Sequence, residues 1–153
     1  MKHDYADIIG RIFEAADSFV VTAEKIANFC AAVGDDNPLY LDPAAAAAGP
    51  HGTIVAPPAF AASFRYADNV FDRIPLFRRG GLMGGIDLEF EAPIRVGDTI
   101  RVSSEVKEIY EKTGRSGAMV FVVVRSTLTN QNGEVVARVD HRMMRRRPTG
   151  DSQ

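Results

Sequence analysis

The chain has 153 residues, of which 46% are hydrophobic and 25% are charged; these proportions exclude a disordered chain and fit one domain with a sizeable core. The formal net charge of −2 excludes binding to nucleic acid or to an anionic membrane through overall positive charge. A single cysteine excludes an internal disulfide, and the first residues lack a signal-peptide pattern, so we expect one cytoplasmic domain over residues 1–153.

The first fifty residues predict short elements. Residues 8–13 hint at a short helix, and residues 18–21 predict a short strand. Thr22 then suits the N-cap of a helix that ends at Gly34, where we expect a left-handed residue. The alanine run 44–48 predicts a second, very short helix.

Residues 57–74 predict the longest helix of the chain. Apolar side chains recur every three or four residues along this segment, and charged side chains occupy the other side. Pro58 suits the first helical turn, where its missing N–H is no loss. Because only strand-like sequence follows, we expect this helix to lie across a sheet that curls around it.

From residue 86 onward the period of the apolar residues changes to two. Residues 86–91 alternate apolar and acidic side chains, as in a half-buried strand. Long strands are expected over 100–111, 118–129 and 134–144, and the apolar run AMVFVVV predicts a central strand covered on both faces. We therefore expect an α+β fold, an antiparallel meander behind one long helix, with residues 145–153 as a frayed tail.

Two stretches are candidates for chemistry: GDDNPLYLD at residues 34–42 and GTIVAPPAF at residues 52–60. The first places the carboxylate of Asp35 beside Asn37 and Tyr40, near a helix end. Turn formation alone also explains Asp, Asn and Pro between two helices, so the residue types leave both interpretations open.

Together with EFEAPIRVGDTIRV at residues 89–102, these stretches resemble the MaoC family of hydratases and dehydratases over nearly the whole chain. The resemblance implies a hotdog fold, in which a curved antiparallel sheet wraps a long central helix. It also implies thioesters of coenzyme A or acyl carrier protein as substrates, with no other cofactor. In catalytic members an aspartate and a histidine act on water, and a glycine N–H polarises the thioester carbonyl.

This sequence keeps only part of the family motif. Asp35 stands in the place of the catalytic aspartate, and Asn37 also matches, but Tyr40 replaces the histidine of the first motif. Ala56 and Pro57 replace the histidine and the glycine of the second. Tyrosine titrates near pH 10 and is a poor base at neutral pH, and proline has no N–H to donate. These departures resemble the N-terminal, fungal-FAS-like dehydratase branch of the family, whose members commonly lack the full pair.

The resemblance therefore implies one half of an (R)-specific enoyl-CoA hydratase or 3-hydroxyacyl-thioester dehydratase, working with a catalytic MaoC-like partner. One alternative is a stand-alone homodimeric enoyl-CoA hydratase in which Asp35 acts with Tyr40 or His51. Another is an acyl-CoA-binding module without chemistry. In each case we expect dimer formation through strand edges, as a homodimer or as a heterodimer with the catalytic chain.

Further side chains are candidates for substrate binding. Phe60 and Phe64 belong to the core or line an acyl tunnel. Arg142 and Arg145 either meet coenzyme A phosphates or an acidic carrier protein, or form a solvated strand end. We expect no metal site, because the histidines lack ligand spacing; they are His3, His51 and His141.

Overall fold

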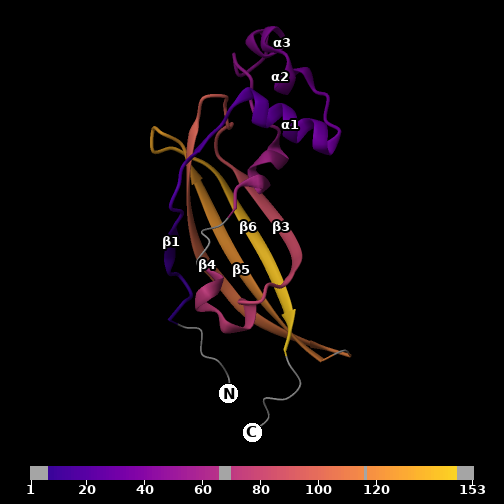
Figure 1. Cartoon of the computed structure of the whole chain (residues 1–153), viewed down its shortest axis with the longest axis vertical. Coiled ribbons are helices and arrows are strands. Elements are labelled where there is room, and N and C mark those ends of the chain that lie inside the picture. The colour runs from indigo at the N-terminus through magenta and orange to yellow at the C-terminus, as the bar shows by residue number, and fades with distance from the viewer. Residues whose placement is uncertain (1–6, 66–69, 116, 148–153) are drawn as a thin grey trace.

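An antiparallel sheet forms the body of the molecule in the computed structural model, which describes residues 7–65, 70–115 and 117–147 (Figure 1). The strands follow the order β1-β4-β5-β6-β3, and β2 pairs with the start of β4. Hairpin connections between the long strands make this an α+β fold, as predicted. The strands are β1 (Ile12–Glu14), β2 (Phe19–Val20), β3 (Leu82–Phe90), β4 (Thr99–Gly114), β5 (Gly117–Thr129) and β6 (Val135–Arg146).

β5 is the central strand and carries the buried apolar run. It lies between β4 and β6, and Val122, Val123 and Val124 are all buried. Successive side chains of a strand point to opposite faces, so both faces of the sheet are covered here. The prediction of a central strand covered on both faces is confirmed.

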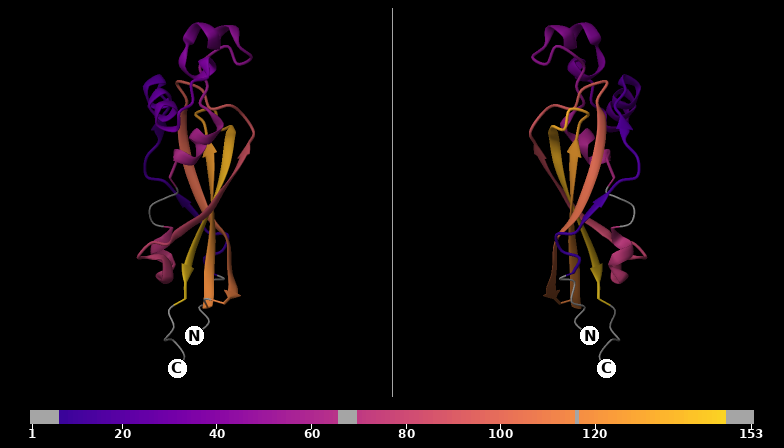
Figure 2. Two further views of the ribbon diagram at one scale, coloured as in Figure 1. Left: turned by 90° about the vertical axis from the view of Figure 1, so that its right-hand side faces the viewer. Right: turned by 90° about the vertical axis from the view of Figure 1, so that its left-hand side faces the viewer.

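Three helices gather at one end of the sheet (Figures 1 and 2). They are α1 (Ala23–Val33), α2 (Pro38–Leu41) and α3 (Pro43–Ala48). Only α1 exceeds two turns, so the candidate motif at residues 34–42 lies among short elements at this end of the molecule.

Local capping explains where these helices begin and end. The Thr22 hydroxyl accepts a hydrogen bond from the N–H of Lys25 at 3.2 Å, and Gly34 ends α1 with a φ of 74°. The Asp42 carboxylate caps α3 by accepting from the N–H of Ala44 at 2.8 Å. The predicted helix ends at Thr22 and Gly34 are confirmed.

The short helix expected over residues 8–13 is not formed. Instead, Ile12 begins β1 and pairs with Glu105 of β4. Phe13 is buried whereas Ile12 is 63% exposed, which is the alternation of a strand. Hydrogen bonds from β4, far along the chain, override the weak helical pattern.

The long helix expected over residues 57–74 is also not formed. Only a short 3₁₀ helix, η1 (Pro58–Ser63), follows Pro57, and Phe64 is extended with φ −74° and ψ 119°. The Ser63 hydroxyl donates to the carbonyl oxygen of Phe60 at 2.6 Å and so competes for an acceptor that a continuing α-helix would use.

Two further single turns complete this segment. Residues 66–69, including Ala67 of the predicted apolar face, lie outside the described residues; beyond them lie η2 (Phe71–Arg73) and η3 (Pro75–Phe77). Pro75 has no N–H with which to extend the preceding turn. Phe60, Phe64 and Ile74 of the predicted apolar face are nevertheless buried, so the apolar pattern identified core residues although it mispredicted their helix.

β3 is an edge strand whose apolar side stays exposed. The predicted alternation is present, but Ile86, Leu88 and Phe90 are 40%, 36% and 45% exposed. Within the single chain β3 is therefore not the half-buried strand that its sequence predicts.

The C-terminal strand extends beyond its expected end. β6 includes Arg145 and Arg146, and the N–H of Arg147 donates to the carbonyl oxygen of Ala118 at 2.9 Å, whereas the frayed tail was expected to begin at residue 145. Residues 148–153 lie outside the described residues. Among the helices of the described ranges, none has the length and apolar character needed to cross a membrane.

Candidate functional site

The first candidate motif forms a tight connection between α1 and α2. The N–H of Asp35 donates to the carbonyl oxygen of Cys30 at 2.9 Å. The Asp35 carboxylate accepts from the N–H of Asn37 at 3.1 Å, and the Asn37 side chain accepts from the N–H of Leu39 at 3.0 Å. Asn37 thus caps α2, and the carboxylate of Asp35 is held in one orientation by the turn.

Asp35, Tyr40 and Cys30 lie close enough to influence one another electrostatically. Burial raises the pKa of the Tyr40 phenol, and the nearby Asp35 and Cys30 raise it further. Burial, followed by the charge of Asp35, also raises the pKa of the Cys30 thiol. Tyr40 is therefore a neutral phenol at pH 7 that can donate a proton but is a poor base, and Cys30 is an unreactive core thiol.

The second motif lies beside the segment that follows β3. The N–H of Ala56 donates to the carbonyl oxygen of Ile94 at 2.8 Å, and the N–H of Val96 donates to that of Ile54 at 3.1 Å. Pro57 and the proline after it have no N–H. Residues 56–58 therefore offer no free backbone donor to a bound carbonyl group.

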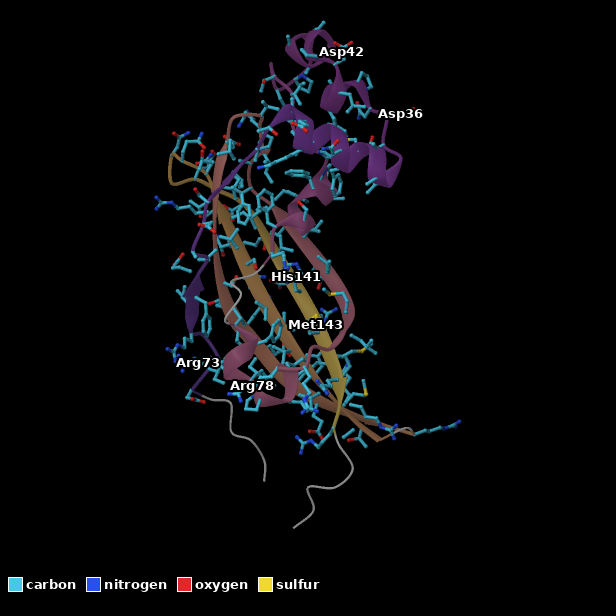
Figure 3. All side chains as sticks on the ribbon, in the orientation of Figure 1. Asp36, Asp42, Arg73, Arg78, His141 and Met143 are labelled. Atoms are coloured by element: carbon cyan, nitrogen blue, oxygen red, sulfur yellow. The ribbon has the colours of Figure 1, made fainter. Side chains whose placement is uncertain are left out.

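A cavity of about 360 Å³ opens between the second motif, α2 and the end of β3. This volume falls within the range of small-molecule sites. Figure 3 shows Asp36 and Asp42 at this helical end of the molecule, far from Arg78 at the other end. The cavity is lined by Leu39, Tyr40, His51, Val55, Ala56, Pro57, Pro58, Phe90, Glu91, Ala92, Pro93 and Ile94.

The cavity brings together part of the predicted site. Tyr40, Ala56 and Pro57 line it, and so does His51 of the alternative hypothesis. Asp35 does not line the cavity, although its charge acts on Tyr40. Among the described residues, no three His, Cys, Asp or Glu side chains are placed to hold a metal ion.

Phe60 of η1 and Phe64, which directly follows η1, lie in the core. They are 6% and 5% exposed, and their rings meet edge to face with centroids 5.6 Å apart. Phe60 also contacts Phe29 at 5.4 Å, and Phe64 contacts Phe19 at 5.8 Å. Both rings line a separate cavity of about 110 Å³.

Arg142 and Arg145 lie on β6 and do not line the 360 Å³ cavity of their own chain. Arg142 donates to the Asp87 carboxylate at 2.9 Å. Arg145 donates to the carbonyl oxygen of Gly80 at 2.8 Å, just before β3 begins. Both are therefore placed along β3 and towards its start, whereas the cavity lies at its end.

Sequence reasoning missed the wall of the cavity that follows β3. Phe90, Glu91 and Ile94 line it because residue 55 forms an antiparallel bridge with Arg95. Pro93 signals that β3 ends here, but no local pattern indicates which distant segment lies opposite. Glu91 adds a carboxylate to the cavity, and it forms an ion pair with an arginine of β6.

Comparisons with known sequences find a family and relatives that match most of this chain. The family model described as "FAS1-like, dehydratase domain region" matches residues 7–139. A UPF0336 protein of Streptomyces avermitilis is 33% identical over 132 residues, which are 84% of this chain and 85% of that protein. A probable enoyl-CoA hydratase alpha subunit of Thermomonospora curvata is 30% identical over 150 residues, which are 87% of this chain and 47% of that protein.

Solved structures share the architecture. The HadBC (3R)-hydroxyacyl-ACP dehydratase complex of Mycobacterium tuberculosis contains a chain with 26% identity and a TM-score of 0.74, covering 95% of this chain and 100% of that one. The MaoC-like dehydratase of Rhodospirillum rubrum has 27% identity and a TM-score of 0.68, covering 92% and 94%.

Proposed function

The chain belongs to the FAS1-like dehydratase-region family, and from this premise we propose that it is a component of a MaoC-like hydratase or dehydratase acting on acyl thioesters. In this proposal it is the half without the full acid–base pair, and it works with a catalytic MaoC-like chain. The reaction is addition of water to an enoyl thioester, or its removal from a 3-hydroxyacyl thioester. Coenzyme A or acyl carrier protein carries the acyl group.

The observation that carries the proposal is the backbone at Ala56 and Pro57. Stabilising the thioester oxyanion needs a preorganised donor, and one such donor typically contributes about 10²–10³ in rate. Here the N–H of Ala56 is already bonded to Ile94 and Pro57 has none. A second loss comes from Tyr40, because a positioned acid–base group typically contributes about 10²–10⁴.

The cavity itself suits binding better than turnover. Most of its wall is apolar, including Val55, Phe90 and Ile94, which suits an acyl chain. The names of two similar proteins support a role in a multi-chain enzyme: an enoyl-CoA hydratase alpha subunit and the two-component HadBC dehydratase.

Activity measurements on the purified chain test this proposal. We expect crotonyl-CoA hydration near the buffer rate with the chain alone, and turnover when a catalytic MaoC-like chain with the complete Asp/His motif is co-purified with it. We also expect the chain alone to bind crotonyl-CoA, as measured by calorimetry, although it does not turn it over. A chain that neither binds the thioester nor changes the activity of any such catalytic chain would contradict the proposal.

A second candidate is a stand-alone enoyl-CoA hydratase. The observation in its favour is that His51 and Tyr40 line the same cavity, which supplies a base and an acid without the family histidines. Ordinary turnover by the chain alone, lost in His51→Gln and in Asp35→Asn but kept in Asp36→Asn, would favour this candidate over the first.

A further inference from the structure

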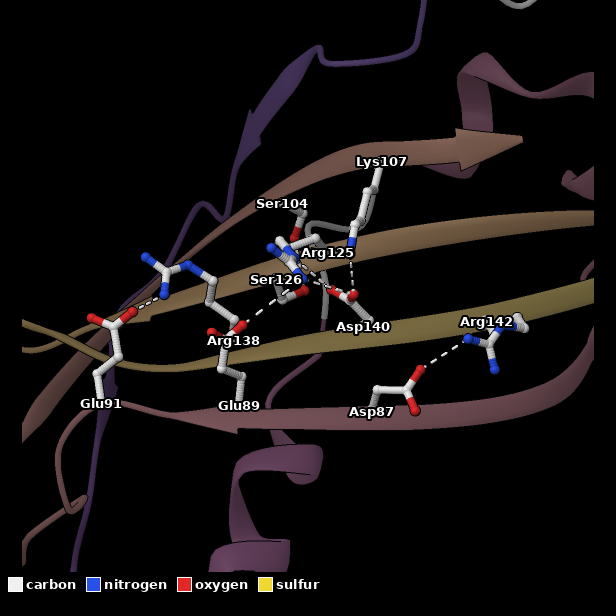
Figure 4. A network of polar contacts seen from close by, with 10 residues as sticks. All are labelled: Asp87, Glu89, Glu91, Ser104, Lys107, Arg125, Ser126, Arg138, Asp140 and Arg142. Carbon is white, nitrogen blue, oxygen red and sulfur yellow. Dashed lines mark hydrogen bonds and ion pairs between the residues drawn. The ribbon is translucent and has the colours of Figure 1, made fainter. Parts of the chain in front are cut away.

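The wall of the proposed thioester cavity that follows β3 is held at both of its ends. Residues 90–94 supply this wall. At its start, the N–H of Glu91 donates to the carbonyl oxygen of Val136 at 3.0 Å. The carboxylate of Glu91 also forms an ion pair with Arg138 of β6, as Figure 4 shows. This end of the wall is therefore fixed to β6.

The other end of this wall is bonded to the second motif. The N–H of Ala56 donates to the carbonyl oxygen of Ile94 at 2.8 Å. Two residues further along, the N–H of Val96 donates to the carbonyl oxygen of Ile54 at 3.1 Å. These two hydrogen bonds join two of the segments that line the cavity, and the first of them occupies the N–H of Ala56.

A buried carboxylate stabilises the turn that follows this wall. Asp98 is only 6% exposed. One oxygen of its carboxylate, Oδ2, accepts from the N–H of Arg95 at 2.8 Å, and its own N–H donates to the carbonyl oxygen of Arg95 at 3.1 Å. Burying a carboxylate is costly unless hydrogen bonds replace its lost hydration. The second oxygen, Oδ1, therefore also needs a donor.

Gln131, in the turn between β5 and β6, supplies this donor. Its side-chain nitrogen donates to Oδ1 of Asp98 at 3.1 Å, and its side-chain oxygen accepts from the N–H of Thr99 at 2.9 Å. The Asn130 side chain fixes the shape of the turn by accepting from the N–H of Glu134 at 3.1 Å. Figure 1 shows this turn at the end of the sheet where the helices gather. A surface turn far along the chain thus holds the turn behind the cavity wall.

We propose that Gln131 is a positioning residue of the thioester cavity: through Asp98 it holds residues 90–94 against the second motif. Neither Gln131 nor Asp98 is among the described residues that line the cavity, so both act through the backbone. Lining residues must be held in place to keep their fit to a ligand. The inference deepens the proposed function, on which it rests for the identity of the ligand, because it assigns the contact that keeps the N–H of Ala56 bonded.

Substitution can reverse the polarity of the hydrogen bond between Gln131 and Asp98. Gln131→Glu keeps an oxygen for the N–H of Thr99, but it replaces the donor and sets two carboxylates side by side. Asp98→Asn keeps an oxygen for the N–H of Arg95, but it sets two amide N–H groups against each other. In the double variant donor and acceptor are exchanged, so the hydrogen bond can form again.

Calorimetry with crotonyl-CoA tests the effect on binding. Gln131→Glu and Asp98→Asn should each weaken binding about tenfold, and the double variant should bind within about twofold of the wild type. Gln131→Ala, which removes the donor without adding a charge, should weaken binding about threefold. Asn132→Ala, at the exposed next residue, is the matched control and should bind like the wild type. Single variants that bind like the wild type, or a double variant no better than either of them, would overturn the inference.

Amide hydrogen exchange, followed residue by residue by nuclear magnetic resonance, shows where the substitutions act. In Gln131→Glu and Gln131→Ala the amides of Ala56 and Val96 should exchange about tenfold faster, because the segment they bond to is released. The amides of Val122 and Val124 in the central strand should keep their wild-type rates. Faster exchange over the whole sheet would assign the effect to overall stability, and unchanged exchange at Ala56 and Val96 would show that Gln131 does not hold the wall; either result contradicts the positioning role.

The outcomes separate the two proposals. Binding of crotonyl-CoA by the wild type that none of these substitutions weakens contradicts the inference and leaves the proposed function standing. A wild type that does not bind crotonyl-CoA contradicts the proposed function, and with it the role of Gln131 towards a thioester. The exchange measurement then decides alone whether Gln131 holds the cavity wall in place.

Discussion

The backbone nitrogen of Ala56 donates to the carbonyl oxygen of Ile94 at 2.8 Å, which removes this N–H from the cavity that Ala56 lines. Pro57 follows and has no N–H at all. The wall of the cavity therefore has no free backbone donor at residues 56–58. In the proposed function, this chain therefore binds the thioester but does not supply the backbone donor that catalysis requires.

Restoring the missing groups should raise activity. We expect the double variant Ala56→His, Pro57→Gly to hydrate crotonyl-CoA at least about 10² faster than the wild-type chain alone, because it regains an imidazole and an N–H. Steady-state kinetics measures the gain, with Ala56→His alone as the control. A folded double variant with the wild-type rate would show that the loss of these two groups does not limit turnover.

Removing the Asp35 charge should lower the pKa of Tyr40. The carboxylate disfavours the phenolate, so Asp35→Asn should make Tyr40 easier to ionise. The difference between the ultraviolet titrations of each protein and its Tyr40→Phe counterpart isolates this phenol. Asp36→Asn, next in sequence, is the matched control, and an equal shift in both variants would argue against a specific effect of Asp35.

The sequence predicted the long strands and the capped helix α1 because these depend on local periodicity and on caps such as Thr22 and Gly34. The hotdog α+β architecture, expected from the resemblance, is confirmed by the structure and its structural neighbours. The helix expected after Pro57 was wrong, because apolar spacing does not report that Phe64 is extended.

The candidate site was only partly predictable. The short motifs identified Tyr40, Ala56 and Pro57 as residues of one cavity. Phe90 and Glu91 join them through a long-range bridge that no local signal encodes. The exposure of the apolar side of β3 was equally hidden, because alternation specifies one apolar face but not whether the same chain covers it.

Phe60 should make a large contribution to stability. Its ring is 6% exposed and meets two other aromatic rings, so Phe60→Ala should lower the free energy of unfolding by about 3–5 kcal/mol. Urea denaturation measures the change. Val20→Ala, at a side chain 49% exposed, should change it by about 0.5 kcal/mol or less. Similar effects of both substitutions would contradict the assignment of Phe60 to the core.

His141 should make the fold sensitive to mild acid. Burial lowers its pKa below the ordinary value of 6.5, although Asp140 partly opposes this shift. As the pH falls through 6.5, the unfolded chain binds a proton that the folded chain does not yet bind, so stability decreases. Denaturation at about pH 7 and about pH 5 should show this loss, and His141→Gln should reduce it. An unchanged pH dependence in the variant would assign the effect to other groups.

The most direct test of the account is the rate of crotonyl-CoA hydration by the purified chain, measured alone and then with a catalytic MaoC-like chain that carries the complete Asp/His motif. The account predicts a rate near the buffer background for the chain alone and turnover for the pair. A chain that alone reaches ordinary enzymatic rates, about 1–10³ s⁻¹, and loses them in Asp35→Asn would contradict it.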